Sequence, residues 1–282
     1  MIKLIGISRA PLFSPNSVMR DTAILQSVAK CLSKQYGCNI RLIDERFLIP
    51  SDLEDVQGAF SMGRAHETLE ILSAAETKGL YMPNSATSLL TLNRRKLRSL
   101  YQSLQINAPK GCDETNLPDD LNSLQYPCWI KRDDGCAQHQ EDVQFIPTST
   151  ELANALEIFR IRGIRHFITE EHTEGDLLKF YGVAGTDFFF STYPTKNGYS
   201  KFGLERFNGS FKNYNFNENE LREQANKLSA STGISIYGGD AIIRPSGEIV
   251  IIDFFNDWPS FSACCNEAAA AIAQLIYQHI SQ

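Results

Sequence analysis

Residues 238–253 read GGDAIIRPSGEIVIID, and this stretch carries the strongest structural signal in the sequence. Two runs rich in isoleucine and valine flank Pro245-Ser246-Gly247, a pattern typical of two antiparallel strands joined by a tight turn. A turn of even length centred on Ser246-Gly247 would place Asp240 directly opposite Asp253. The segment therefore predicts a hairpin that brings two carboxylates together.

Two opposed aspartates require a compensating charge. Side chains directly across an antiparallel pair lie about 5 Å apart, and like charges there destabilise the sheet. A cation or a shared proton relieves the pair, and Mg²⁺ usually takes one or two carboxylates plus substrate phosphates. A second register stays open, because a type I turn on Pro245-Ser246 with a bulge at Gly247 would put the two aspartates on opposite faces.

The N-terminal region, residues 1–86, alternates strands with helices. The expected strands are Ile2–Ile7, Asn39–Leu48 and Val56–Met62, and the expected helices are one that starts at the turn Ser14–Ser17 and ends near Tyr36, and Ala65–Lys78. This βαβ alternation predicts a parallel sheet with helices on its faces. No GxGxxG motif follows the first strand, so a dinucleotide site is not indicated.

A basic segment follows. Between Glu76 and Asp113 there are six basic residues and no acidic one. The spacing predicts one helix over Thr87–Gln105, with Arg94 and Lys96 at the edges of its apolar stripe. A solvated basic face and a site for a small anion both remain open.

The rest of the chain predicts a mixture of short strands and helices. The expected strands are Cys128–Lys131, His166–Thr169, Leu177–Val183 and Phe188–Tyr193, the expected helices are Glu151–Arg162, Leu221–Thr232 and Ala268–Ile280, and Asn197–Asn217 is expected to be a partly ordered loop. The strand over His166–Thr169 ends in the acidic sequence Glu170-Glu171-His172.

Composition excludes several classes of protein. The chain has 282 residues, 27 basic against 33 acidic side chains, and a net charge of −6. This balance argues against nucleic-acid binding, which needs clustered Lys and Arg. No apolar run approaches the ~20 residues of a membrane span, and seven cysteines without CxxC spacing predict reduced thiols in the cytoplasm.

Taken in order, these elements resemble the ATP-grasp superfamily, which includes D-alanine–D-alanine ligase, glutathione synthetase and the ribosomal-protein glutamate ligases. The segment EEHTEGDLLKFYGVAG also looks like the corresponding part of the inositol trisphosphate kinases. The resemblance implies an α/β protein with a βαβ pre-ATP-grasp domain (1–86), a small ATP-grasp lobe (87–170) and a large lobe with the metal site (171–282).

The resemblance also implies roles for single residues. The implied nucleotide-binding set is Arg94 or its substitute Lys96, Lys131, the hinge Glu170, Glu171 and His172, and Asp176 for the ribose. Lys179 would face the transferred phosphate, and Asp240, Asp253 and Asn256 would hold one or two Mg²⁺ ions. Arg64 is a candidate for a substrate carboxylate, with a plain surface arginine as the alternative.

Two departures from the family pattern are visible. The expected phosphate lid, DDGCAQHQEDV, has four acids and one glycine, so it would repel a triphosphate. Asp253 and Asn256 are three residues apart instead of two, which makes Asp257 an alternative third ligand.

The implied activity is an ATP- and Mg²⁺-dependent carboxylate–amine (or thiol) ligase that acts on small molecules through an acyl phosphate. Two alternatives remain: a kinase for a polyol or phosphorylated substrate, and a nucleotide-binding protein with weakened catalysis. The sequence leaves the substrates and the oligomeric state open.

Overall fold

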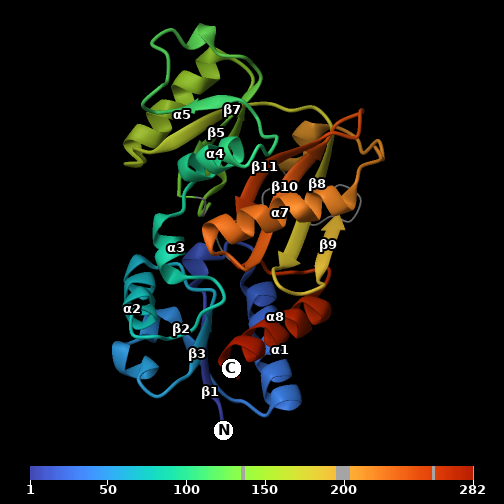
Figure 1. Ribbon diagram of the computed structural model, residues 1–282. Helices are drawn as coiled ribbons and strands as arrows, with labels where there is room; N and C mark the ends of the chain where they lie inside the picture. Colours follow the sequence, from blue (N-terminus) through green and yellow to red (C-terminus); the bar gives the residue numbers. More distant parts are fainter. Residues whose placement is uncertain (135–136, 195–203, 256–257, 282) are drawn as a thin grey trace.

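Three sheets organise the part of the chain that the computed structural model describes, which comprises residues 1–134, 137–194, 204–255 and 258–281 (Figure 1). Their strand orders are β2-β1-β3, β4-β7-β5-β6 and β11-β10-β8-β9. No helix in these ranges is long and apolar enough to cross a membrane.

The first sheet is parallel, as the βαβ alternation predicted. It contains β1 (Lys3–Ser8), β2 (Asn39–Asp44) and β3 (Gly58–Ser61), and its helices are α1 (Val18–Tyr36) and α2 (His66–Glu76). The second strand is shorter than expected. It ends at Asp44, whose side chain accepts a hydrogen bond from the Arg46 backbone and so starts a 3₁₀ turn over Glu45–Phe47.

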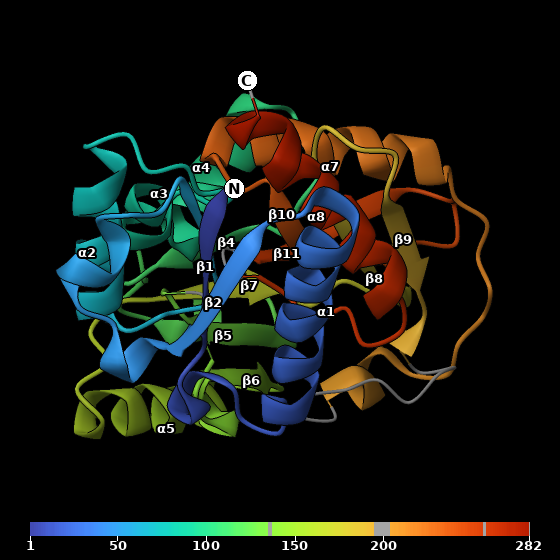
Figure 2. The same ribbon diagram turned by 90° about the horizontal axis from the view of Figure 1, so that it is seen from below.

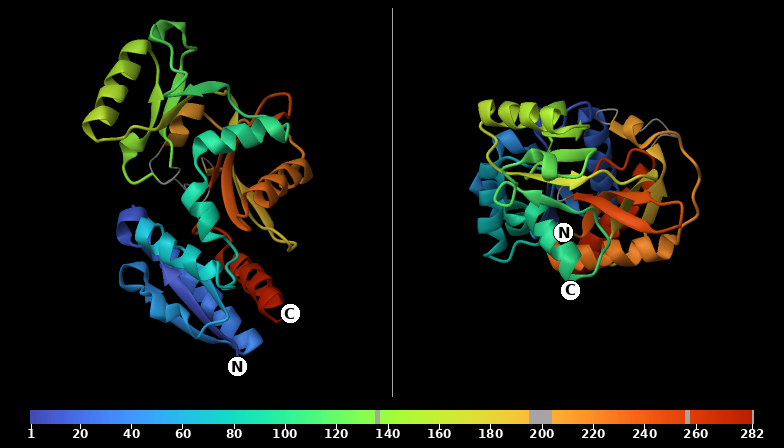
Figure 3. Two further views of the ribbon diagram at one scale, coloured as in Figure 1. Left: turned by 60° about the vertical axis from the view of Figure 1, so that its left-hand side comes forward. Right: turned by 90° about the horizontal axis from the view of Figure 1, so that it is seen from above.

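The expected single helix over Thr87–Gln105 is wrong. The structure has α3 (Ala86–Thr91) and α4 (Arg94–Ser103), separated at Leu92 and Asn93. The Asn93 side chain accepts a hydrogen bond from the Lys96 backbone at 2.9 Å, which makes it the N-cap of a new helix. This segment runs from the N-terminal sheet to the other two, where α4 packs against β7 and against α7 (Glu218–Thr232) (Figure 3).

The second sheet forms a small lobe with its own core. Its antiparallel strands are β4 (Gly111–Asp113), β5 (Cys128–Arg132), β6 (Val143–Ile146) and β7 (Phe167–Glu171), covered by α5 (Ser149–Ile161). Ile130, Leu152 and Phe159 belong to one buried cluster that is confined to this lobe.

The third sheet, in contrast, shares its core with the N-terminal unit. It contains β8 (Asp176–Val183), β9 (Phe189–Thr192), β10 (Ile236–Ile243) and β11 (Ile249–Phe255). Ile5 and Ile7 of β1 lie in one buried cluster with Leu178 of β8 and Ile251 of β11. The closing helix α8 (Cys265–Ile280) packs along α1, and Figure 2 shows the two side by side.

The β10–β11 hairpin combines the two registers that the sequence left open. Near the turn, Gly247 has φ +85° and Ala241 pairs with Ile251, as expected for a bulged turn. A β-bulge then skips Ile252, so that Asp240 pairs with Asp253. The predicted opposition of the two aspartates is therefore confirmed, although the turn itself has the alternative geometry.

Candidate functional site

A cleft of about 300 Å³ lies where the N-terminal unit, the small lobe and the large sheet meet. Eight of the residues singled out from the sequence line it: Arg94, Lys131, Glu170, Glu171, His172, Lys179, Asp240 and Asp253. The alternation of side chains along a strand explains why residues at every second position line the cleft. On β8 these residues are Leu177, Lys179 and Tyr181, and on β10 they are Asp240 and Ile242.

The Asp240 carboxylate is paired with a cation from the neighbouring strand. Lys179 lies opposite Asp240 in the β8–β10 ladder, and its Nζ is 2.9 Å from Asp240 Oδ1. The Asp240–Asp253 repulsion expected from the sequence is therefore relieved on one side by a lysine.

Asp253 is paired with Arg94. Arg94 Nη2 lies 2.8 Å from Asp253 Oδ2, and Arg94 is 6% exposed. Burial alone would raise the pKa of Asp253, but the charges of Arg94 and Lys131 outweigh it and hold the pKa below its ordinary value. The other oxygen, Asp253 Oδ1, accepts no hydrogen bond from the described residues and stays accessible in the cleft.

Lys131 makes the third ion pair of the cleft. Its Nζ is 2.7 Å from Glu170 Oε2 and donates a hydrogen bond of 2.8 Å to the carbonyl of Ile252. Ile252 is the bulged residue of β11, so this bond joins the small lobe to the irregular part of the hairpin. Glu170 is the member of the Glu170-Glu171 pair that points inward, at 4% exposure.

The two aspartates suit a magnesium ion. They offer hard oxygen ligands from opposed positions in the cleft, with Asp253 Oδ1 accessible. Within the described ranges, no group of three or more His, Cys, Asp or Glu side chains could hold a metal, so the other ligands of a magnesium ion would be of another kind, such as water or phosphate oxygens. Asn256 and its alternative Asp257 lie outside the described residues.

The hinge side of the cleft is aromatic. Trp129 Nε1 donates a hydrogen bond of 3.1 Å to Nδ1 of His172, and burial lowers the pKa of this histidine. The ring therefore acts as a neutral acceptor. The Glu171 side chain turns toward the backbone of Lys110, from which it accepts a hydrogen bond of 3.3 Å.

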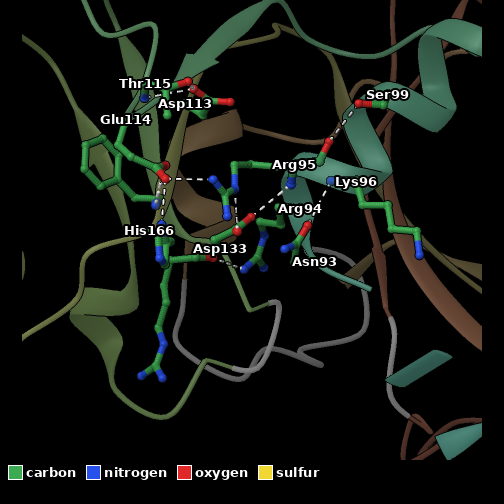
Figure 4. Close-up of polar contacts among 12 residues, drawn as sticks. Asn93, Arg94, Arg95, Lys96, Ser99, Asp113, Glu114, Thr115, Asp133 and His166 are labelled. Atoms are coloured by element: carbon green, nitrogen blue, oxygen red, sulfur yellow. Dashed lines mark hydrogen bonds and ion pairs between the residues drawn. The ribbon is translucent and has the colours of Figure 1, made fainter. Parts of the chain in front are cut away.

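Three predicted residues are not brought into the cleft. Asp176 is buried, and its carboxylate accepts hydrogen bonds from the backbones of Lys212 and Tyr214 at 2.7 and 2.9 Å. Lys96 extends away from the other residues drawn in Figure 4, and its Nζ is 3.4 Å from Thr91 Oγ1. Arg64 lines a separate groove of about 550 Å³ between the N-terminal unit and the small lobe.

The expected repulsion by the acidic lid is largely neutralised. Asp133 accepts from the Arg95 backbone at 2.9 Å and from Arg95 Nε at 2.8 Å, as Figure 4 shows. Asp134 pairs with Arg132 at 2.6 Å, and the fully buried Asp142 pairs with Arg162 at 2.5 Å. Arg95 and Arg162 come from other segments of the fold, so their pairing with the lid could not be read from the sequence, whereas Arg132 directly precedes the lid.

A further wall of the cleft was missed altogether. It comes from the segment after β1 and from the segment before α8, and includes Ser14, Arg20, Asp21, Trp258 and Ser260. One signal could have pointed to it: the carboxyl ends of parallel strands are where α/β folds build their binding crevices, and β1 ends just before Arg9.

Comparisons with known proteins agree with this architecture. No protein-family model and no curated protein matches the sequence. Solved structures do match, at 12–16% identity. D-alanyl-alanine synthetase A from Vibrio cholerae has a TM-score of 0.69 at 12% identity, with 99% of this chain and 97% of that chain covered. VanG D-Ala:D-Ser ligase from Enterococcus faecalis has a TM-score of 0.67 at 16% identity, with 98% of each chain covered.

A third similar structure is the RimK domain ATP-grasp protein from Sphaerobacter thermophilus. Its TM-score is 0.66 at 15% identity, with 97% of this chain and 99% of that chain covered. The likeness spans nearly the whole of each chain. This protein has the ATP-grasp fold.

Proposed function

We propose that the protein is an ATP- and Mg²⁺-dependent ligase that joins a carboxylate to an amine. The observation that carries the proposal is the opposed pair of Asp240 and Asp253 in a cleft that also holds Arg94, Lys131 and Lys179. Three cations, each paired with a carboxylate, suit the binding of a nucleotide with its metal. The similarity in fold to proteins named D-Ala:D-Ser ligase and D-alanyl-alanine synthetase supports the same class.

The reaction needs positioning and charge neutralisation more than a nucleophilic side chain. A substrate carboxylate oxygen attacks the terminal phosphorus of ATP, and the bond from that phosphorus to the ADP oxygen breaks. The amine then adds to the acyl carbon of the acyl phosphate, phosphate leaves with the former carboxylate oxygen, and the amine loses one proton. The products are ADP, phosphate and an amide.

The ion pairs of the cleft give its residues their roles. Nucleotide phosphates would replace the carboxylate partners of Arg94 and Lys131, which frees Asp253 and Glu170. Asp240 and Asp253 would hold Mg²⁺, which when bound neutralises charge on the phosphates. Lys179, which lines the cleft and pairs with Asp240, would face the phosphoryl group while it is transferred to the substrate carboxylate. The neutral His172 and the adjoining backbone would border the base.

The test is ADP release with pooled substrates. Purified protein is incubated with ATP and Mg²⁺ and with pools of amino acids, dipeptides and dicarboxylates. We expect ADP release that requires one carboxylate and one amine, together with a product lighter than the sum of the two by one water. ADP release with a hydroxyl compound alone would indicate a kinase instead, and the absence of turnover with nucleotide still bound would indicate a binding protein.

A further inference from the structure

The end of the cleft that lies away from the hinge differs in chemistry from the rest. Its wall is formed by the first turn of α1 and by the segment before α8, and it includes Ser17, Arg20, Trp258, Ser260 and Ser262. Hydroxyl, indole and guanidinium groups dominate this end, and all of them can donate hydrogen bonds.

Arg20 provides a positive charge at this end of the cleft. Its Nη2 donates to the carbonyl of Asn16 and to Ser17 Oγ, both at 2.8 Å, within its own turn. No carboxylate of the described residues pairs with Arg20, in contrast to Arg94 and Lys131. The other guanidinium nitrogens of Arg20 remain available to the cleft.

Trp258 provides an unused buried donor at the same end. Its side chain is 2% exposed and packs against Phe60, yet Nε1 has no hydrogen-bond partner within the described part of the chain. A buried donor without a partner costs free energy, so a ligand that accepts this hydrogen bond is favoured. The hydroxyls of Ser260 and Ser262, which line the same cleft, lie 3.1 Å from each other.

The one described carboxylate at this end is already satisfied. Asp21 is 6% exposed, accepts a hydrogen bond from Ser14 Oγ at 2.6 Å and pairs with Arg9 at 3.4 Å. An ammonium group of a substrate would therefore find no acceptor here with an unused charge. An oxyanion would find Arg20, which pairs with no carboxylate of the described residues, and several hydrogen-bond donors.

Tyr181 connects this end to the reacting centre. Burial raises the pKa of its hydroxyl, while the positive charges of Lys179 and Arg20 oppose that effect, so both cations act on this group. Its hydroxyl makes no hydrogen bond to any described residue, and Tyr181 lines the cleft. Tyr181 and Lys179 are two positions apart on β8, which corresponds to about 7 Å.

We propose that Arg20, Trp258 and the two serines form a subsite for a second, unreactive carboxylate of the substrate. The inference deepens the proposed function and rests on it: the substrate would be a dicarboxylate, or an amino acid or short peptide with a free carboxylate several bonds from the reacting group.

Binding of simple probes without nucleotide tests this subsite directly. The chain has two tryptophans, so the Trp129→Phe variant reports on Trp258 alone by fluorescence. Glutarate is titrated against its uncharged diamide, glutaramide, and against inorganic phosphate. We expect a saturable change with glutarate, at least about tenfold weaker binding of glutaramide, and weaker binding of phosphate, because charge-assisted hydrogen bonds are the stronger ones.

Variants assign the effect to Arg20. Arg20→Gln in the same background should raise the Kd for glutarate about tenfold or more, and Arg20→Lys should restore part of the loss. The control is Lys30→Gln, an exposed residue on the same helix, which should leave the Kd unchanged. Circular dichroism of each variant confirms that the fold is retained.

The outcomes separate this inference from the proposed function. Glutarate binding that depends on Arg20, in a protein without ATP turnover, would support the subsite and overturn the ligase. Turnover with a KM that is unchanged in Arg20→Gln would support the ligase and overturn the subsite. Equal binding of glutarate and glutaramide, tighter binding of phosphate, or an unchanged Kd in Arg20→Gln would overturn the subsite.

Discussion

The two ends of the cleft handle charge in opposite ways. On the hinge side each cation already has a carboxylate: Arg94 has Asp253, Lys131 has Glu170 and Lys179 has Asp240. At the other end Arg9 pairs with Asp21, but within the described residues Arg20 pairs with no carboxylate and the indole Nε1 of Trp258 has no hydrogen-bond acceptor. We therefore expect the hinge side, which is called the paired half below, to exchange ion-pair partners when a charged ligand binds, and the other end to bind a charged group without such an exchange.

The largest expected effect is on turnover in the paired half. Asp240→Asn removes a charge from the proposed metal pair, and we expect ADP release to fall by about 10³-fold, the size typical of losing one electrostatic contact to a transition state. Arg20→Gln should act mainly on KM. The control is Asp119→Asn, an exposed small-lobe residue. If Asp240→Asn retained turnover within a few-fold of wild type, the paired half would not be the reacting half.

The next effect is on stability. Asp253→Ala leaves the buried Arg94 guanidinium without its carboxylate, and breaking a buried pair in this way costs about 3–5 kcal/mol. Chemical denaturation in EDTA measures the loss. The sequence suggested two opposed aspartates that repel each other, whereas in the structure Asp253 is held by the ion pair with Arg94.

An exposed pair in the same hairpin provides the matched control for stability. Arg244 and Glu248 are 2.8 Å apart but 41% and 45% exposed. Glu248→Ala should therefore cost only about 0–1 kcal/mol. Similar losses for Glu248→Ala and Asp253→Ala would show that burial does not strengthen the cleft pair.

The Asp253 pair also predicts how stability depends on pH. The pKa of Asp253 is lowered from 3.8, so the folded state favours its charged form. The stability that this provides is fully present above the unfolded value and is lost as the pH falls through the lower folded value. The difference in unfolding free energy between wild type and Asp253→Asn should therefore be constant from pH 5 to 7 and shrink below pH 4. A difference that grew on acidification would contradict the assigned sign.

The hairpin shows how far the sequence could lead. The residues of the turn determine its bulged geometry locally, through Gly247 at positive φ. The bulge at Ile252, which returns Asp240 to a position opposite Asp253, is supported by a hydrogen bond from Lys131, more than a hundred residues earlier. The local sequence pattern is compatible with either register, but it does not predict that a bulge joins the two registers in one hairpin.

The same limit applies to the rest of the site. Arg94 and Lys131 could be picked out by charge and position, because each lies on a regular element with a clear pattern. Their carboxylate partners could not be predicted, since Asp253 and Glu170 meet them only through the packing of the lobes. Asn93 is the opposite case: an N-cap is a local signal, and here it was outweighed by an apolar stripe that continued past it.

The smallest expected effect concerns the aromatic border of the paired half. Phe207, in the 3₁₀ turn Leu204–Asn208, stacks on Phe145 with ring centroids 4.5 Å apart and meets the edge of Trp129 at 5.8 Å. Aromatic pairs of this kind contribute about 0.5–1.5 kcal/mol beyond the area they bury. Phe207→Ala should therefore lower global stability only slightly while releasing this turn from the small lobe.

Hydrogen exchange is the measurement that isolates this contact. In Phe207→Ala, amides of residues 204–208 should exchange faster, and those of β8 and β10 should keep their protection, because the buried clusters that hold these strands do not include Phe207. Phe47→Ala, which truncates a ring that is 69% exposed, serves as the control. Unchanged exchange at 204–208 would mean that the contact of Phe207 with Phe145 does not hold the turn in place. Faster exchange throughout β8 would mean that the turn and the sheet that carries Asp240 and Asp253 unfold as one unit.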